Sequence, residues 1–319
     1  MLYTLPSELI ELILSYLDNK SLLGIYNITN NTIIYRIVNY RLENELIKHE
    51  SIIRFNNKSL VELLLYYNQN YNKLMCYASK YNHKDLVDFF ISKGADNWLY
   101  GMCYATKNNH KELVDFFISK GANDWNWGMY YAAKNNHKDL LIFFISKGAD
   151  GWDWAMQAAI INNSKDLLKF IISKGVNNWD YAMSYAAQYN HKDLVDFFIS
   201  KGASNWNNAM AYAALNNHKD LVEFFISKGA DDWNKSMSYA IINNHKELVE
   251  FFISKGANNW NSAMAYAAEN NHKDLVDFFI SKGANDWDLA INYALVYRHK
   301  ELVEYLKKKR DNYYIFEYS

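Results

Sequence analysis

The chain of 319 residues has little of what secreted and membrane proteins are built from. It contains two cysteines and one proline, and no apolar run approaches the length of about 20 residues that spans a bilayer. The amino terminus has no basic region followed by a signal-type apolar core, so we expect a soluble, intracellular protein. The formal net charge of -1 supplies no field that attracts nucleic acid or an acidic membrane. We therefore expect neither nucleic acid nor a membrane as a partner.

The sequence also lacks the motifs that mark common enzyme sites. It has no glycine-rich phosphate loop, no G-x-S-x-G, no H-E-x-x-H and no C-x-x-C. His and Asp recur close together, as at His137 and Asp139, but no distinctive nucleophile stands beside them. We expect a protein that is not an enzyme, with no catalytic residues, no cofactor and no bound metal.

What the chain does contain is a repeat. One copy, residues 125–151, reads WNWGMYYAAKNNHKDLLIFFISKGADG. The glycine that follows Ile-Ser-Lys recurs with a constant spacing of 27 residues. These glycines are Gly94, Gly121, Gly148, Gly175, Gly202, Gly229, Gly256 and Gly283. Such a period is typical of a solenoid, in which each copy buries its apolar faces against its neighbours.

Each repeat is predicted to form two helices. When the Trp is counted as position zero, apolar or small residues fall at positions zero, three, four, seven and eight, which share one helical face. An Asn or Asp precedes the Trp in all but one repeat, where Gly151 stands, and its side chain can cap the helix. An Asn such as Asn217 is expected to end the first helix in a left-handed turn. The second helix, KDLVEFFISK, stops at Gly229, and its wide apolar arc predicts neighbours on most sides.

Histidine, methionine, tryptophan and cysteine recur at fixed positions of the repeat. We interpret the histidines as turn residues, because equivalent positions lie about 8 to 10 Å apart, whereas a shared zinc needs each nitrogen within about 2.1 Å. The same spacing predicts free thiols at Cys76 and Cys103. The Trp and Met series are interpreted as core. The histidines are His83, His110, His137, His191, His218, His245, His272 and His299, with Ser164 interrupting the series.

The run YAALNNHKDLVEFFISKGAD, residues 212–231, resembles the helical part of an ankyrin repeat, and the resemblance extends over residues 71 to about 312. It implies an all-α fold, an α-solenoid of stacked helix pairs. An ankyrin repeat has a period of about 33 residues and begins with T-P-L-H, which is missing here. The missing residues fall between Gly-Ala and the first helix, so we expect the projecting β-hairpin finger of the family to be truncated.

Residues 1–45 differ in kind from the repeats. They contain the only proline, and apolar residues follow it at helical spacing. The stretch LPSELIELILSYLD resembles an F-box, the motif that joins a substrate receptor to the adaptor subunit of cullin-RING ubiquitin ligases. In the downstream half, Asn-Asn-Thr-Ile at residues 30–33 replaces the basic, tryptophan-containing end of that motif. The alternative is a helical cap over the open end of the solenoid. The residues that match the F-box are Leu5, Pro6, Glu8, Leu9, Ile13, Leu17 and Leu22.

The sequence therefore predicts three regions. Residues 1–45 form the F-box-like module, residues 46–70 a transition with a capping helix, and residues 71–319 a solenoid of about nine repeats, the last of which is a cap. We expect this cap to have a polar outer face, because its second helix lacks the Phe pair and the Gly. The basic cluster at residues 307–310 either stabilises the carboxyl end of that helix or is a nuclear localisation signal. The expected location is the cytoplasm, with the nucleus as the alternative.

The repeats differ most at positions two, five and nine of the first helix, which we expect to form an exposed face. In ankyrin-like stacks this concave face commonly binds the partner. Position two is aromatic in four consecutive repeats, and exposed aromatic rows mark interaction sites. The alternative is that these rings pack on one another or under the truncated fingers. The predicted partner-binding residues are Tyr100, Lys107, Trp127, Tyr130, Lys134, Trp154 and Tyr181.

The two resemblances together imply an adaptor for protein recognition. The F-box would bind the ubiquitin-ligase adaptor protein of an SCF-type ligase, and the concave face would bind an unidentified protein target. Such pairings resemble proteins of large DNA viruses that redirect host ubiquitination. The alternative is a binding scaffold that sequesters a host or viral protein without ubiquitination.

Overall fold

The computed structural model describes residues 49–54, 56, 61–62, 64–65 and 70–317, so the F-box-like residues lie outside the described part. Every regular element within the described residues is an α-helix, as the repeat pattern predicts. The chain divides into an N-terminal body, Met1–Gly151, and a C-terminal body, Trp152–Ser319, and each is described by itself. The division follows Gly151, the residue that interrupts the series of Asn and Asp caps.

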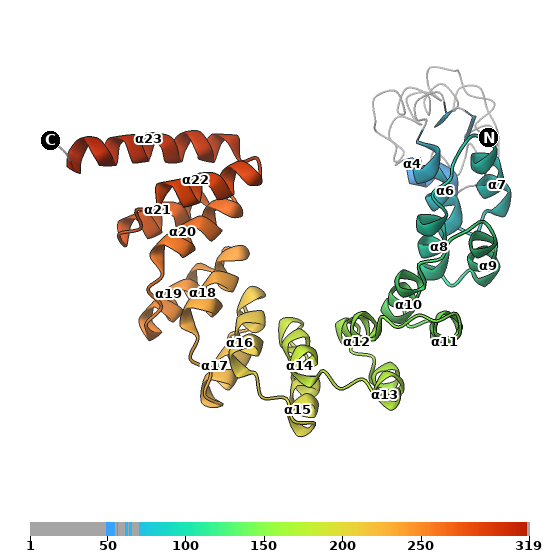
Figure 1. Cartoon of the computed structure of the whole chain (residues 1–319), viewed down its shortest axis with the longest axis horizontal. Coiled ribbons are helices and arrows are strands. Elements are labelled where there is room, and N and C mark those ends of the chain that lie inside the picture. Colours follow the sequence, from blue (N-terminus) through green and yellow to red (C-terminus); the bar gives the residue numbers. More distant parts are fainter. Residues whose placement is uncertain (1–48, 55, 57–60, 63, 66–69, 318–319) are drawn as a thin grey trace, which may run out of the picture. The chain divides into compact units, whose positions relative to one another are not determined.

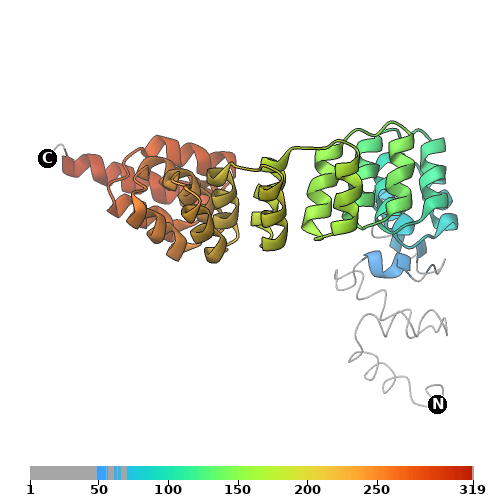
Figure 2. The ribbon, with the colours of Figure 1, turned by 90° about the horizontal axis from the view of Figure 1, so that it is seen from below.

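Each body is a row of helix pairs joined by short turns and loops (Figures 1 and 2). In the N-terminal body, the short helix α4 (His49–Arg54) precedes the pairs α6 (Tyr71–Lys80) and α7 (Lys84–Ser92), α8 (Trp98–Lys107) and α9 (Lys111–Ser119), and α10 (Trp125–Lys134) and α11 (Lys138–Ser146). In the C-terminal body, the pairs are α12 (Trp152–Ile161) and α13 (Lys165–Ser173), α14 (Trp179–Gln188) and α15 (Lys192–Ser200), α16 (Trp206–Leu215) and α17 (Lys219–Ser227), α18 (Trp233–Ile242) and α19 (Lys246–Lys255), α20 (Trp260–Glu269) and α21 (Lys273–Ser281), and α22 (Trp287–Val296) and α23 (Lys300–Glu317).

The predicted helix ends are confirmed. The Asn or Asp before the Trp accepts a hydrogen bond from the backbone amide three residues later; for example, Asp232 Oδ1 accepts from Lys235 N at 3.0 Å. Asn217, between α16 and α17, has a φ of 61°, and Gly229, after α17, has a φ of 101°. Glycine adopts this left-handed backbone without a steric penalty and Asn tolerates it, which explains why Asn follows the first helix and Gly follows the second helix of a repeat.

A side chain at position one of the first helix fixes the short loop that leads to the next repeat. Asn207 Oδ1 accepts hydrogen bonds from the backbone amides of Asp231 at 2.7 Å and Asp232 at 2.9 Å. This pair of hydrogen bonds satisfies loop amides in the place where an ankyrin repeat has its hairpin finger, and the described loops contain no strand. The same pair of hydrogen bonds is accepted by Asn72, Asn126, Asp180, Asn234 and Asn261.

The recurring histidine links each repeat to the one before it, which confirms its structural role. His218 Nε2 donates to the backbone oxygen of Gln188 at 2.9 Å, and His245 donates to that of Leu215 at 3.0 Å. The acceptor is a carbonyl at the end of the preceding first helix, which has no partner inside its own helix. Equivalent bonds are made by His83, His110, His137, His191, His272 and His299.

The core consists of columns, each made of the residues at one repeat position in successive repeats, as the spacing predicts. The Met column of the first helices is buried from Met102 to Met264, and Val222 and Phe225 of α17 are also fully buried. The Trp at position zero is half-buried in most repeats. Both cysteines, Cys76 and Cys103, are free and buried. Burial raises the pKa of their thiols to about 12, which keeps them protonated and unreactive.

The buried Phe of the second helix packs differently according to the residue at position three of the first helix. In three repeats of the C-terminal body, where position three is Ala, the ring stacks on the Trp, and the centroids of Trp206 and Phe225 lie 6.5 Å apart. In α10 of the N-terminal body, position three is Gly128, and a Cβ atom added there would lie 2.4 Å from the Phe144 ring. Gly128 therefore makes room for the ring.

We expect Gly128→Ala to destabilise the N-terminal body, although Ala favours a helix by about 1 kcal/mol over Gly. Overpacking a buried ring costs about 1–3 kcal/mol, so the net loss in the free energy of unfolding should be about 1 kcal/mol. Chemical denaturation measures the change. The matched control is Gly128→Ala with Phe144→Ile, which recreates the Ala155 and Ile171 pair of the next repeat and should recover most of the loss. A more stable single variant would show that the ring moves onto its Trp without cost.

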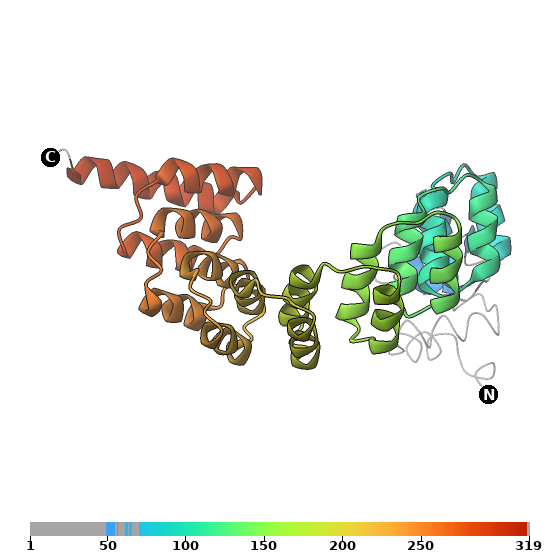
Figure 3. The ribbon, with the colours of Figure 1, turned by 60° about the horizontal axis from the view of Figure 1, so that its bottom comes forward.

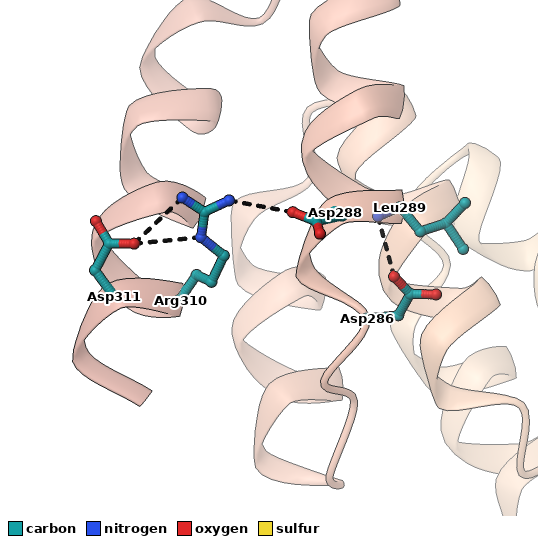
Figure 4. Close-up of polar contacts among 5 residues, drawn as sticks. All are labelled: Asp286, Asp288, Leu289, Arg310 and Asp311. Carbon is teal, nitrogen blue, oxygen red and sulfur yellow. Dashed lines mark hydrogen bonds and ion pairs between the residues drawn. The ribbon is translucent and has the colours of Figure 1, made fainter. Parts of the chain in front are cut away.

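The last repeat is closed by α23, a helix of 18 residues that extends beyond its neighbours (Figures 1 and 3). Arg310 on α23 donates from Nη1 to Asp288 Oδ1 at 3.1 Å and also bonds Asp311 (Figure 4). Asp288 stands at position one of its helix, the position that holds the loop amides of the following repeat elsewhere. Arg310 thus supplies donors where the described chain has no further repeat.

The outer face of this last repeat is less polar than expected. Leu295, Val296 and Tyr297, at the end of α22, are between 52% and 75% exposed. Ile241 and Ala268, which are equivalent to Leu295 in the two preceding repeats, are fully buried. The expectation holds for the charged residues of α23 but not for α22, because the α22 sequence keeps the apolar pattern of an inner repeat.

Candidate interaction face

The candidate interaction face consists of positions two, five, six and nine of the first helices. These positions fall in one arc opposite the buried stripe. On α8 they are Tyr100, Cys103, Tyr104 and Lys107. We call this surface the first-helix face and describe it separately for each body.

In the N-terminal body, the structure brings together five of the predicted partner-binding residues, on the adjacent helices α8 and α10. Tyr100 is 58% exposed and Trp127 is 40% exposed. Lys107 and Lys134 are exposed at the carboxyl ends of the same helices, and Tyr130 is half-buried. The predicted exposure of position two is confirmed for both aromatic residues.

Trp127 is supported by aromatic contacts within its own helix. Its ring stacks on Tyr131 at a centroid distance of 5.9 Å and meets Tyr130 edge-on at 5.8 Å. Lys134 Nζ donates to the Tyr130 hydroxyl at 3.2 Å. These contacts limit the conformations of the Trp127 ring, and a preorganised ring loses less entropy when a partner binds.

In the C-terminal body, the first-helix face begins with Trp154 on α12, which is 46% exposed. Tyr181, on the neighbouring helix α14, is only half-buried rather than fully exposed. Its ring lies against Tyr185, with centroids 4.6 Å apart. The seven predicted residues therefore form one group of five and one group of two, in separate bodies.

The prediction that position five belongs to the exposed face is wrong for several repeats. Cys103, Ser184 and Ala211 occupy this position and are buried. Neighbouring first helices approach closely there, as shown by Asn208 Nδ2, which donates across to Ser184 Oγ at 2.9 Å. Small side chains fill position five because the next helix covers it.

Position six, which was not among the positions predicted to be exposed, carries a tyrosine in most repeats. In the C-terminal body, the rings of Tyr185, Tyr212 and Tyr239 follow one another at centroid distances of 5.4 Å. Burial raises the pKa of all three hydroxyls, so they remain neutral donors and acceptors. The signal was present in the sequence as a Tyr that recurs with the repeat, at residues 77, 104, 131, 185, 212, 239, 266 and 293.

The chemistry of this face suits recognition rather than catalysis. It offers aromatic rings, neutral hydroxyls and lysine ammonium groups over several adjacent helices. Among the described residues, no group of three or more His, Cys, Asp or Glu side chains is placed to hold a metal ion. Broad surfaces of this kind, lined by successive repeats, are the surfaces that solenoids use to bind partners.

Comparison with known proteins identifies the repeat. The family model described as Ankyrin repeats (3 copies) matches residues 74–153, 155–236 and 237–315, which together make up most of the chain. No curated protein matches the chain. Among the described residues, no helix is both long and apolar enough to cross a membrane. Ankyrin repeats indicate a scaffold for protein–protein interaction, typically without catalysis. The chain belongs to the ankyrin-repeat family.

Proposed function

We propose that this ankyrin-repeat protein is a substrate receptor of an SCF-type cullin-RING ubiquitin ligase. In this proposal, residues 1–45 act as an F-box that binds the adaptor protein, and the first-helix face binds the target protein. The F-box part is supported by the motif LPSELIELILSYLD. The target-binding part is supported by the geometry of the repeats.

The observation that carries the target-binding role is the exposure of two tryptophans at position two. Most Trp residues at position zero are half-buried, and Trp206 stacks on Phe225 in the core. Trp127 and Trp154 instead lie on the first-helix face and stay exposed. Tryptophan dominates the energetics of protein interfaces, so exposed copies on a rigid scaffold favour a binding role.

We also propose that residues 46–70 link the F-box module to the solenoid of residues 71–319. Glu50 on α4 accepts hydrogen bonds from Lys80 at 2.6 Å and from the Tyr81 hydroxyl at 2.8 Å. Ile52 and Ile53 of the same helix are fully buried. These contacts support a transition segment that packs on the first repeat and covers its open side.

The test is affinity purification of the full chain from cells, with Leu9→Asp and Ile13→Asp combined in one variant. The two charges should disrupt an apolar adaptor contact and lower recovery of adaptor and cullin by at least about tenfold. Recovery of the target should not change. The matched control adds two Asp residues outside residues 1–45, at the exposed loop residues Asn258 and Asn285, and should retain the adaptor.

The F-box assignment would be contradicted if the double variant Leu9→Asp and Ile13→Asp is folded and still purifies with adaptor and cullin. Purification of one unrelated protein, with neither adaptor nor cullin, would favour the second function, a scaffold that sequesters its partner without ubiquitination. Both functions use the same first-helix face, so only the adaptor distinguishes them.

A further inference from the structure

The first-helix face of the N-terminal body is basic as well as aromatic. Position nine is a lysine in the described first helices α6, α8 and α10, at Lys80, Lys107 and Lys134, and position two of α6 is Lys73. No Asp or Glu occupies position two, five, six or nine of these helices. The face therefore has charge of one sign, although the whole chain is nearly neutral.

Contacts inside the protein neutralise only part of this charge. Lys80 Nζ pairs with Glu50 Oε1 at 2.6 Å, and Lys134 Nζ lies 5.4 Å from the centroid of the Tyr130 ring. Lys73 and Lys107 are exposed, and neither makes an ion pair with any residue that the structure describes. Two ammonium groups are thus available to an acidic partner.

The lysines at position nine are not required by the helices themselves. A cation near the carboxyl end of a helix is favourable, which would be the simplest reason for them. None of the equivalent helices of the C-terminal body ends in a cation: their last residues are Ile161, Gln188, Leu215, Ile242, Glu269 and Val296. Since the same fold forms without these cations, helix stability does not explain why they gather in one body.

The aromatic and cationic groups occupy opposite ends of the same helices. Position two and position nine are separated by about 10 Å along a helix. Tyr100 and Trp127 therefore provide an apolar end, and Lys107 and Lys134 provide a cationic end. Asp96 and Asp124 lie just before α8 and α10, at the aromatic end.

We propose that the first-helix face of the N-terminal body binds an acidic polypeptide segment that carries a large apolar side chain. This inference rests on the proposed target-binding role and specifies the chemistry of the target. Carboxylates of the segment pair with Lys107, and its apolar side chain packs on Tyr100 and Trp127. A nucleic acid fits less well, because its regularly spaced phosphates would meet Asp96 and Asp124 at the aromatic end.

Fluorescence anisotropy with the full chain tests this proposal. The probe is a dye-labelled synthetic peptide of Glu and Asp around a central Phe-Leu pair, and the comparison peptide carries Gln and Asn instead. The acidic peptide should bind more tightly, and added salt should weaken it. Lys107→Glu should weaken binding by about tenfold, because it replaces an attraction by a repulsion.

The matched control is Lys235→Glu, which makes the same charge change on the first-helix face of the C-terminal body. It should change the dissociation constant by less than about twofold, since Lys235 is not part of the first-helix face of the N-terminal body. If Lys107→Glu does not fold, Lys107→Gln replaces it and should weaken binding by about threefold.

Three outcomes would overturn the inference: no binding of the acidic peptide, equal binding of the neutral peptide, or tighter binding of a single-stranded oligothymidine probe that also depends on Lys107. In each case the ligase proposal stands if the purified target and adaptor still depend on Trp127 and on the F-box residues. Conversely, if residues 1–45 prove not to bind the adaptor, the binding of the acidic peptide to the first-helix face can still be measured and interpreted.

Discussion

A chain that lacks residues 206–232 should fold into a solenoid that is one repeat shorter, whereas a chain that lacks only residues 206–218 should lose the structure of this region. The first deletion removes one whole repeat, α16 and α17, together with the loop that precedes α18. The second removes α16 and leaves α17 without its partner. Each repeat contacts only its neighbours. After the whole-repeat deletion, the repeat of α14 and α15 can therefore pack on the repeat of α18 and α19 through equivalent surfaces.

The hydrogen bonds explain why the longer deletion is tolerated. It brings Asn205 directly before Trp233, where Asn205 can cap α18 as it now caps α16. Asp180 keeps its bonds to the amides of Ser204 and Asn205. His245, which now donates to the Leu215 carbonyl, would donate to the equivalent carbonyl of Gln188.

The shorter deletion exposes the apolar side of α17. Leu221, Val222 and Phe225 are buried, and exposing three such side chains costs about 5 kcal/mol or more. Circular dichroism melts compare the two variants: the 27-residue deletion should keep a cooperative transition and the helix content per residue of the parent. Equal damage from both deletions would show that the repeat register assigned here is wrong.

Replacing Trp127 and Trp154 by Ala should cost about 2 kcal/mol or more each in affinity for the target, or roughly 30-fold in the dissociation constant. Each ring is an exposed aromatic anchor on a first helix. The comparison is between the purified target and each single variant, measured by titration calorimetry. Asn208→Ala and Ser262→Ala change position two of other repeats and should have little effect.

The same two substitutions should leave stability nearly intact. Trp127 contacts Tyr130 and Tyr131 but is not part of the buried stripe, so its loss should cost about 1 kcal/mol or less of folding free energy. Thermal melts measure this. A large loss of stability with unchanged target affinity would place these tryptophans in the core and the target elsewhere on the molecule.

The sequence alone determined the period, the helix ends and the buried columns, because each follows from interactions between residues close in the chain. Gly229 and Asn217 mark the helix ends, since few residues adopt a left-handed backbone. The Met column was predicted because helical spacing defines its face. The exposure of Tyr100 and Trp127 at position two followed from the same periodicity, whereas their role in binding stays a prediction.

Only the tertiary structure decided which of the outward positions are covered, because that depends on the distance to the next helix. Ser184 is buried by the neighbouring α16, whereas the tyrosines one position later line the surface. The acceptor of His137 lies 30 residues back in the chain, and the Phe144 ring lies under Gly128 from a different helix. Leu295 has the same apolar character as its buried equivalents, yet it is exposed, since no described helix packs on that side of α22. Helical periodicity gives the direction of a side chain, but burial requires a second surface, and that surface comes from a separate part of the chain.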